Sequence, residues 1–226
     1  MTDPVDIAAL RKELVRRFRT ATRELEVAGR TVSLLMPANA DDLISESDFD
    51  RDERLPYWAD LWPSARILAE ELAVMRLRGQ RVLELGCGLG LVAMGAVLGG
   101  ADVTATDYYE DATQFALVNV AEATGKRIAT RMVNWVDMPA DLGKFDVVLA
   151  SDVLYEHRYA SLVANAIAST LVRGGEAIVA DPGRIALQEF LDECSKRGLE
   201  HTSDPRPFRD GEIRQTVTLW RLRWRV

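Results

Sequence analysis

The stretch "RVLELGCGLG", Arg81 to Gly90, decides the fold. Its first five residues have the composition of a buried strand, and glycines follow at positions 86, 88 and 90. Glycine lets the chain turn sharply and lets a ligand touch the backbone without an intervening Cβ. A helix that begins after such a turn points its free N–H groups toward whatever binds there. The stretch therefore predicts a strand–turn–helix unit with a ligand site at the carboxyl end of the strand.

Strand and helix patterns alternate from this point to the end of the chain. Apolar runs predict strands at 81–85, 102–107, 127–133, 145–152, 176–181 and 212–226, the last pairing antiparallel with a segment near 199–203. Helical spacing predicts helices at 91–98, 111–123, 157–171 and 185–197. Such alternation is typical of an α/β fold with helices on both faces of the sheet. We expect a Rossmann-like, doubly wound, seven-stranded sheet whose last strand is antiparallel.

The residues before Arg81 predict an extension that precedes this sheet. Residues 5–20 have the spacing of an amphipathic helix, 23–37 alternate around Gly29 like a hairpin, and the acidic segment 39–53 reads as a loop. Pro63 suits the first turn of a further helix. We expect an N-terminal helix and hairpin extension over residues 1–54 and the main domain over 55–226.

Composition excludes several classes of function. The 226 residues are 48% hydrophobic and carry a net charge of −7, so one core is expected and nucleic acid is not the expected partner. Arginines crowd residues 11–23, which we interpret as a solvated helix face. Two distant cysteines and two histidines offer no disulfide framework or metal site. Residues 1–10 lack the basic-then-apolar layout of a signal peptide, and no apolar run approaches the ~18 residues that a membrane span needs, so we expect a cytoplasmic protein with no membrane partner.

An acidic residue one βαβ unit after the glycines indicates a nucleoside cofactor. Asp107 ends the next strand, where a carboxylate can accept hydrogen bonds from both ribose hydroxyls. Leu91 stands where a dinucleotide fingerprint needs glycine, and Glu84, just before the turn, would repel a pyrophosphate but could hold an ammonium group. These features favour S-adenosylmethionine (SAM) over NAD. A turn that serves only strand–helix packing is the alternative.

The motifs resemble those of a known enzyme family. "VLELGCGLG" followed by "VTATD" is similar to motif I and the acidic post-motif of seven-strand SAM-dependent methyltransferases. "PYWADLWPSARILAEEL", "NW" at 134–135 and "SDVLYE", which contains a D-x-x-Y motif, resemble the family-16 methyltransferases, which include many protein lysine methyltransferases. "ADPGR" and the hairpin resemble the branch that methylates the electron-transfer flavoprotein β subunit. Bacterial members of this group are often labelled predicted nicotinamide N-methyltransferases.

The resemblance implies a set of cofactor-binding residues. Trp62 would form a wall at the methionine end of SAM, while Glu84, Gly86 and Gly88 would hold that end and let it approach. Asp107 would bind the ribose. Packing is the alternative for Trp62, which could be a core or surface anchor four residues after Trp58.

Further roles follow at the third and fourth strands. The resemblance implies that Trp135 lies near adenine, that Ser151 and Asp152 line the site, and that Tyr155 lies at its mouth. We hypothesise that Asp152 orients the incoming amine and that Tyr155 adds a hydrogen bond or a ring face toward the partly cationic nitrogen. Alternatively, Asp152 caps the following helix and Trp135 only packs.

Four functions remain open at this stage. The first is a protein lysine N-methyltransferase, favoured by D-x-x-Y and the Trp-Pro segment. The second is a small-molecule, nicotinamide-like N-methyltransferase with the same cofactor site. The others are a SAM-binding module without catalysis, against which Asp152 and Tyr155 count, and an NAD-dependent oxidoreductase, against which Glu84 and Leu91 count. In each of the first two readings SAM is the methyl donor and no metal is needed.

Overall fold

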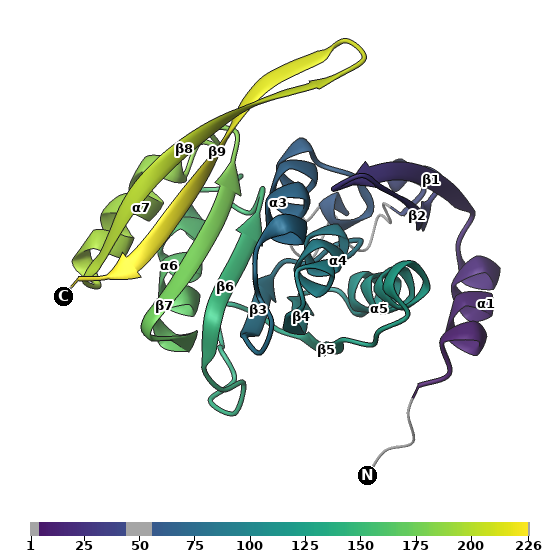
Figure 1. Ribbon diagram of the computed structural model, residues 1–226, viewed down its shortest axis with the longest axis horizontal. Helices are drawn as coiled ribbons and strands as arrows, with labels where there is room; N and C mark the ends of the chain where they lie inside the picture. Colours follow the sequence, from purple (N-terminus) through teal and green to yellow (C-terminus); the bar gives the residue numbers. More distant parts are fainter. Residues whose placement is uncertain (1–4, 44–55, 226) are drawn as a thin grey trace.

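The computed structural model describes residues 5–43 and 56–225, and its centre is a seven-stranded sheet (Figure 1). The strand order is β5-β4-β3-β6-β7-β9-β8, in which β9 runs in the direction opposite to the other strands of the sheet. The strands are β3 (Arg81–Leu85), β4 (Asp102–Asp107), β5 (Ala129–Met132), β6 (Phe145–Ser151), β7 (Leu171–Asp181), β8 (Leu199–Asp210) and β9 (Ile213–Trp224). The predicted fold class is confirmed. The order reverses between β3 and β6, and such a switch point is where open α/β sheets bind ligands.

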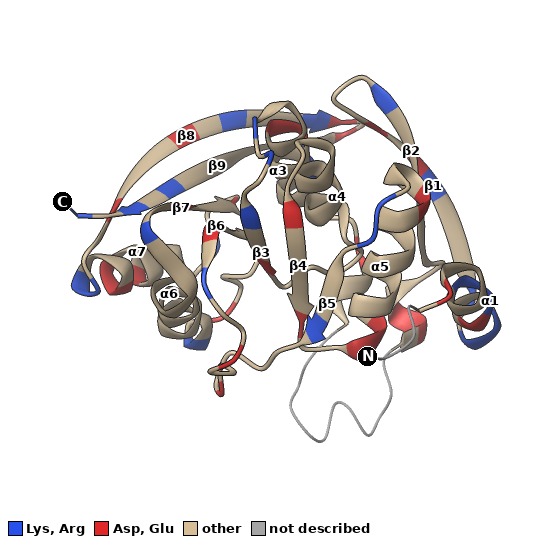
Figure 2. Cartoon of the chain, turned by 60° about the horizontal axis from the view of Figure 1, so that its bottom comes forward, with Lys and Arg blue, Asp and Glu red and all other residues tan. Residues whose placement is uncertain are grey.

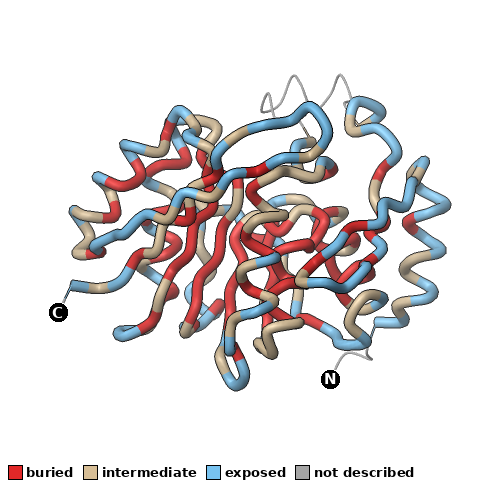
Figure 3. The backbone as a smooth tube through the Cα atoms, turned by 45° about the horizontal axis from the view of Figure 1, so that its top comes forward, coloured by how far each residue is buried: buried red, intermediate tan, exposed pale blue. Residues whose placement is uncertain are grey.

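Helices cover both faces of this sheet, as the alternating pattern predicts. Helices α3 (Pro63–Val74), α4 (Leu91–Leu98) and α5 (Glu110–Thr124) lie on one face, and α6 (Arg158–Thr170) and α7 (Leu187–Lys196) on the other (Figure 1). Successive residues of β6 point to opposite faces, so Leu149 belongs to the α3–α5 cluster and Val148 to the α6–α7 cluster. The strands at the centre are therefore buried on both sides (Figure 3).

The N-terminal extension packs against the α3–α5 layer. It consists of α1 (Ile7–Arg17) and a hairpin of β1 (Thr20–Val27) and β2 (Arg30–Pro37). Leu14 and Leu34 are fully buried in the same hydrophobic cluster as α3, α4 and α5. Arginines of α1 pair with α5, for example Arg11 with Glu122 at 3.0 Å. The basic segment is thus an ion-paired helix face, and the expected boundary at residue 54 lies outside the described residues.

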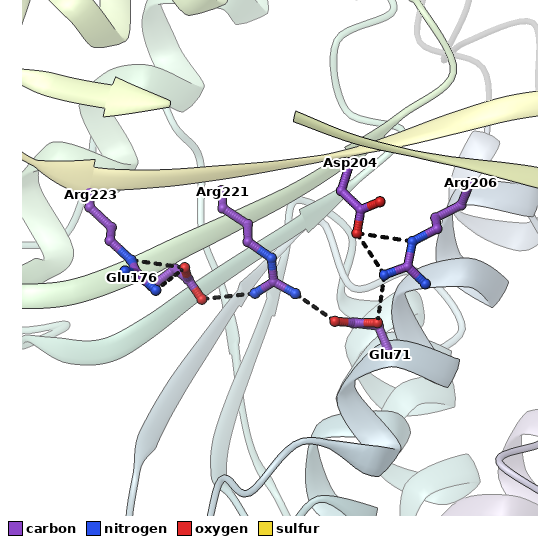
Figure 4. Close-up of polar contacts among 6 residues, drawn as sticks. All are labelled: Glu71, Glu176, Asp204, Arg206, Arg221 and Arg223. Carbon is purple, nitrogen blue, oxygen red and sulfur yellow. Dashed lines mark hydrogen bonds and ion pairs between the residues drawn. The ribbon is translucent and has the colours of Figure 1, made fainter. Parts of the chain in front are cut away.

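The β8–β9 hairpin is longer than the sequence predicted. Thr218 of β9 pairs with Asp181, the last residue of β7, so the hairpin continues beyond the sheet (Figure 1). Acidic and basic residues are interspersed along it (Figure 2). Glu71 of α3 joins Arg206 of β8 to Arg221 of β9, and neighbouring charges extend this network (Figure 4). The network fixes the hairpin to α3, the helix whose first turn borders the site described below.

The remaining predicted elements agree with the structure to within a few residues. The loop predicted at 39–53 is described only up to residue 43 and contains a short 3₁₀ helix at Ala40–Leu43, and a second one spans Tyr57–Ala59. In residues 5–43 and 56–225 we find no helix long and apolar enough to cross a membrane. The same residues hold no cluster of three or more His, Cys, Asp or Glu side chains suited to a metal ion.

Candidate active site

A cavity opens at the carboxyl ends of β3, β4, β5 and β6, between the first turn of α3 and the start of α6. Most of the residues predicted to form the site line it. They are Trp62, Gly86, Gly88, Asp107, Trp135, Ser151, Asp152 and Tyr155. Residues that are distant in sequence thus meet around one space at the switch point of the sheet. Glu84 is the exception and does not line the cavity.

The glycine turn forms the floor of the cavity and has little space for side chains. Two consecutive N–H groups, of Gly86 and Cys87, donate to the Thr106 carbonyl at 2.9 Å, which ties the turn to the end of β4. Gly88 has φ +48°, and a Cβ there would lie 3.0 Å from the carbonyl oxygen of Trp58. The bare backbone at this point therefore meets both the cavity and the chain segment before α3.

Asp107 connects the glycine turn to the acidic end of β4. Its carboxylate accepts hydrogen bonds from the backbone N–H groups of Gly88 at 2.9 Å and Tyr109 at 3.1 Å. Burial raises the pKa of Asp107, and these backbone donors oppose the rise. Each carboxylate oxygen has a further lone pair. Asp107 can therefore brace the turn and still accept a hydrogen bond from a hydroxyl group in the cavity.

Glu84 is buried below the turn rather than exposed in the cavity. It is 1% exposed, and the backbone of Ala93, in the first turn of α4, is close enough to lower its pKa. Its Oε2 has no hydrogen-bond partner among the described residues. Burial raises the pKa of Glu84 well above its ordinary value, and Asp107 adds to this rise. Glu84 therefore faces the cavity only through the glycine turn, so a role with the ligand would be electrostatic or through water.

Asp152 begins the loop after β6 in an unusual backbone conformation. Its φ is +58°, which is uncommon for a residue with a side chain, and its N–H donates to the Ala180 carbonyl of β7 at 3.0 Å. The carboxylate is nearly inaccessible, and Oδ1 accepts a 2.6 Å hydrogen bond from Nε of Arg184. Oδ2 is buried without a partner among the described residues. The alternative interpretation, in which Asp152 caps the following helix, is not observed. Helix α6 has His157 as its N-cap and no side-chain capping hydrogen bond.

An arc of aromatic rings surrounds the space next to Asp152. Tyr155 contacts the ring of Tyr57 at 5.1 Å and that of Tyr159 at 5.0 Å, and Tyr159 in turn contacts Trp135 at 5.6 Å. Burial raises the pKa of Tyr155, and a hydrogen bond with Tyr159 contributes. The phenol therefore stays neutral and can donate a hydrogen bond, and the ring faces can contact a cation.

The two predicted tryptophans both line the cavity and come from segments far apart in the sequence. Trp62 precedes α3, and its indole N–H donates to the Tyr57 carbonyl at 2.8 Å. Trp135 lies against Gly86, where a Cβ would come 3.5 Å from its ring, and its Nε1 is buried without a partner in the described part of the chain. Trp135 therefore has both a packing contact and a position on the cavity wall.

The sequence analysis missed several cavity residues. Trp58 lines the cavity and its ring contacts those of Phe115 and Tyr109 at tilted angles, and Tyr159 closes the aromatic arc. Tyr159 lies in the first turn of α6 and Tyr155 in the loop before it, so only the packing of that loop against the helix brings the two rings together. Arg184 contacts Asp152 without lining the cavity, and the quoted segment ADPGR did not indicate this contact, because only the sheet order brings the loop after β7 against the loop after β6.

The electrostatics of the site favour a cationic ligand. Four carboxylates are buried at this edge of the sheet, those of Glu84, Asp107, Asp152 and Asp181. Burial raises the pKa of Glu84, Asp107 and Asp181. Asp152 pairs with Arg184, whereas Glu84 and Asp107 have no ion-pair partner among the described residues. Buried acids without a paired cation are costly, and a positively charged ligand lowers this cost. A sulfonium or ammonium group therefore fits the charge of this cavity, and a pyrophosphate does not.

Comparison with known proteins agrees with this geometry. The lysine methyltransferase family matches residues 56–193. The chain is 30% identical over 133 residues to the electron transfer flavoprotein beta subunit lysine methyltransferase of Xenopus laevis, covering 57% of the chain and 53% of the relative. It is 37% identical over 112 residues to the protein N-lysine methyltransferase METTL21A of Danio rerio, covering 46% of the chain and 50% of the relative. The chain thus spans about half the length of these curated relatives.

Solved structures show the same fold at lower sequence similarity. The SAM-bound magnesium protoporphyrin IX methyltransferase of Synechocystis PCC 6803 superposes with a TM-score of 0.59 at 21% identity, covering 80% of this chain and 94% of that one. This likeness concerns the arrangement of the sheet and helices.

Proposed function

The chain belongs to the lysine methyltransferase family, and from this membership we propose that it transfers a methyl group from SAM to a lysine side chain of a protein substrate. One observation carries the proposal beyond family membership. A carboxylate suited to a ribose, Asp107, and a carboxylate with a free buried oxygen, Asp152, line the same cavity on either side of the glycine turn.

We propose that the cofactor lies over the glycine turn. Asp107 would bind the ribose, Gly86 and Gly88 would allow close approach, and Trp135 would contact the adenine. Trp62 and Ser151 would border the methionine end, with Glu84 contributing negative charge from beneath the turn. The orphaned Glu84 oxygen and the lack of room for side chains at Gly88 support this fit. When bound, SAM supplies an electrophilic methyl group on a sulfur that leaves as a neutral thioether.

The acceptor amine must present a lone pair next to this methyl group. A free lysine has a pKa of about 10.4 and is protonated at neutral pH, and an apolar, aromatic surrounding favours its neutral form. Asp152 would accept a hydrogen bond from the amine through Oδ2 and so direct its lone pair. Tyr155, kept neutral by burial, would face the nitrogen as positive charge develops on it. Proximity and orientation of this kind can supply up to ~7–11 kcal/mol of the barrier.

The proposal also includes the bounds of the domain and the location of the protein in the cell. Residues 55–226 would form the methyltransferase domain, because the family match begins at residue 56. A cytoplasmic location is supported by Cys87 and Cys194, which are both buried and unpaired.

The test is transfer of labelled methyl groups in a cell lysate. The purified protein is incubated with lysate of the source organism and methyl-labelled SAM, after which protein and small-molecule fractions are separated. The proposal predicts label in a protein band, on a lysine Nε by mass spectrometry, and none with the Asp152→Asn variant. Label found only in the small-molecule fraction would instead indicate the nicotinamide-like N-methyltransferase. No label in either fraction would indicate a SAM-binding module without catalysis.

A further inference from the structure

Arg184 reaches the site from a loop on the neighbouring strand. It follows β7 by three residues, and its Nε donates to Oδ1 of Asp152 at 2.6 Å. Its guanidinium also lies 5.2 Å from the ring centroid of Trp62, at the start of α3. One side chain thus connects the proposed amine-orienting carboxylate with the proposed cofactor wall, and the arginine itself is one-third exposed.

The loop that carries Arg184 is held in place by its own hydrogen bonds. The carboxylate of Asp181 accepts from the backbone N–H groups of Gly183 and Arg184, both at 2.7 Å. Further along, the Ala186 N–H donates to the Leu154 carbonyl at 3.2 Å, which joins this loop to the Asp152–Tyr155 loop. The position of Arg184 is therefore set by backbone contacts, and the side chain extends from a fixed base.

The contact leaves Asp152 with one oxygen bound and one oxygen free. Because Oδ1 is bound to Arg184, the carboxylate cannot rotate without breaking a charge-assisted hydrogen bond. Oδ2 is buried and unpartnered among the described residues, and Asp152 lines the cavity. The positive φ of Asp152 is an uncommon backbone conformation for a residue with a side chain. The hydrogen bond from Arg184 therefore fixes the orientation of the side chain in addition to the backbone.

We propose that Arg184 is a positioning residue that fixes the Asp152 carboxylate, so that Oδ2 alone receives the amine of the substrate. This inference rests on the proposed function. Arg184 acts through Asp152 and does not touch the transferred methyl group. The guanidinium also lies over the ring of Trp62, 5.2 Å from its centroid, which gives the arginine a second contact beside Asp152.

The test compares Arg184→Ala and Arg184→Lys with wild type and with Arg173→Ala. Arg173 is a matched control, because its guanidinium also lies over a tryptophan ring, that of Trp224 at 4.1 Å, but it lines a separate cavity that Asp152 does not line. Turnover is measured on the protein band labelled by the wild type in the lysate assay, and SAM affinity is measured by calorimetry. Guanidinium chloride at tens of millimolar is then added as a replacement for the lost group.

We expect Arg184→Ala to lower kcat by roughly tenfold to a hundredfold, the loss that a misplacement of ~1 Å brings. SAM affinity should stay within twofold, which also shows that the variant is folded. Added guanidinium should restore at least part of the lost turnover in Arg184→Ala only. Arg184→Lys should recover less, because an ammonium lacks the planar fork of guanidinium, and Arg173→Ala should match wild type.

Three results would overturn the inference. Unchanged turnover in Arg184→Ala would show that Asp152 needs no anchor. A fall in SAM affinity as large as the fall in turnover would make Arg184 a cofactor ligand, and a loss that guanidinium does not relieve would make its role purely structural. A wild-type enzyme that labels no protein would instead contradict the proposed function, and the inference would fall with it.

Discussion

The backbone N–H of Gly88 donates to Oδ2 of Asp107 at 2.9 Å, which joins the glycine turn after β3 to the acidic end of β4. The residue proposed to bind the ribose is therefore also part of the scaffold of the turn. A substitution of Asp107 should therefore have two effects, one on the affinity for the ligand and one on the stability of the fold, and each can be measured separately.

Replacing Asp107 should weaken SAM binding. A hydrogen bond to a charged group is worth roughly 1.5–3 kcal/mol, so Asp107→Ala should lower the affinity about tenfold or more in calorimetry. Asp107→Asn is the matched control, because its amide oxygen can still accept from Gly88, and it should lose affinity with a smaller loss of thermal stability. Unaltered affinity in both variants would rule out the ribose assignment.

Glu84 should reduce the stability of the ligand-free protein at neutral pH. Burial raises its pKa in the folded chain, so between its ordinary value and the raised one the folded state binds more protons than the unfolded state. The free energy of unfolding therefore falls as pH rises through this window. Glu84→Gln should unfold at a higher temperature than wild type at about pH 7.5, by ~2–4 °C per kcal/mol, with the difference shrinking toward about pH 4. A variant less stable than wild type at both pH values would contradict this.

Asp152→Asn should separate catalysis from cofactor binding. Asparagine tolerates the left-handed backbone found at this position, whereas alanine would add strain of about 1–2 kcal/mol, so the asparagine variant keeps the fold while it removes the charge. Turnover should fall by about a hundredfold or more, within the range attributed to general acid–base groups, while SAM affinity stays near that of wild type. Normal turnover with bound SAM would exclude a role for the carboxylate.

Gly90 should prove necessary for packing rather than for binding. Its φ is +81°, and a Cβ there would lie 2.6 Å from Cα of Ala116 in α5. Gly29, in the N-terminal hairpin, has a similar φ of +73° with no neighbouring atom within 4 Å. Both alanine variants should lose stability through backbone strain, and Gly90→Ala should lose clearly more in denaturant unfolding. Equal losses of stability in the two variants would show that α5 can move away from residue 90 without a cost in free energy.

The sequence predicted the sheet well because its signals are local. The segments 102–107 and 145–152 have the composition of buried strands, and the glycines at 86, 88 and 90 have the pattern of a strand-to-helix turn. The length of β8 was underestimated, because Pro205 and Pro207 argue against a strand interior and an edge strand tolerates them. The start of β7 was placed too late, because Gly174 and Gly175 resemble a turn.

The sequence predicted which residues form the candidate site better than it predicted how their side chains are arranged. Strand ends collect side chains at one edge, so Asp107 and Asp152 could be placed together from the pattern alone. The direction of the Glu84 side chain could not be predicted, because its burial depends on how the helix after the turn packs against β3. The contact of Arg184 with Asp152 depends on tertiary packing between two loops, which no local pattern encodes.

The most direct test of the whole account is calorimetric titration of the purified protein with SAM and, separately, with NAD. The account predicts binding of SAM with one site per chain, weakened in Asp107→Ala, and no measurable heat with NAD. Binding of NAD in preference to SAM, or no binding of SAM by the folded protein, would contradict it.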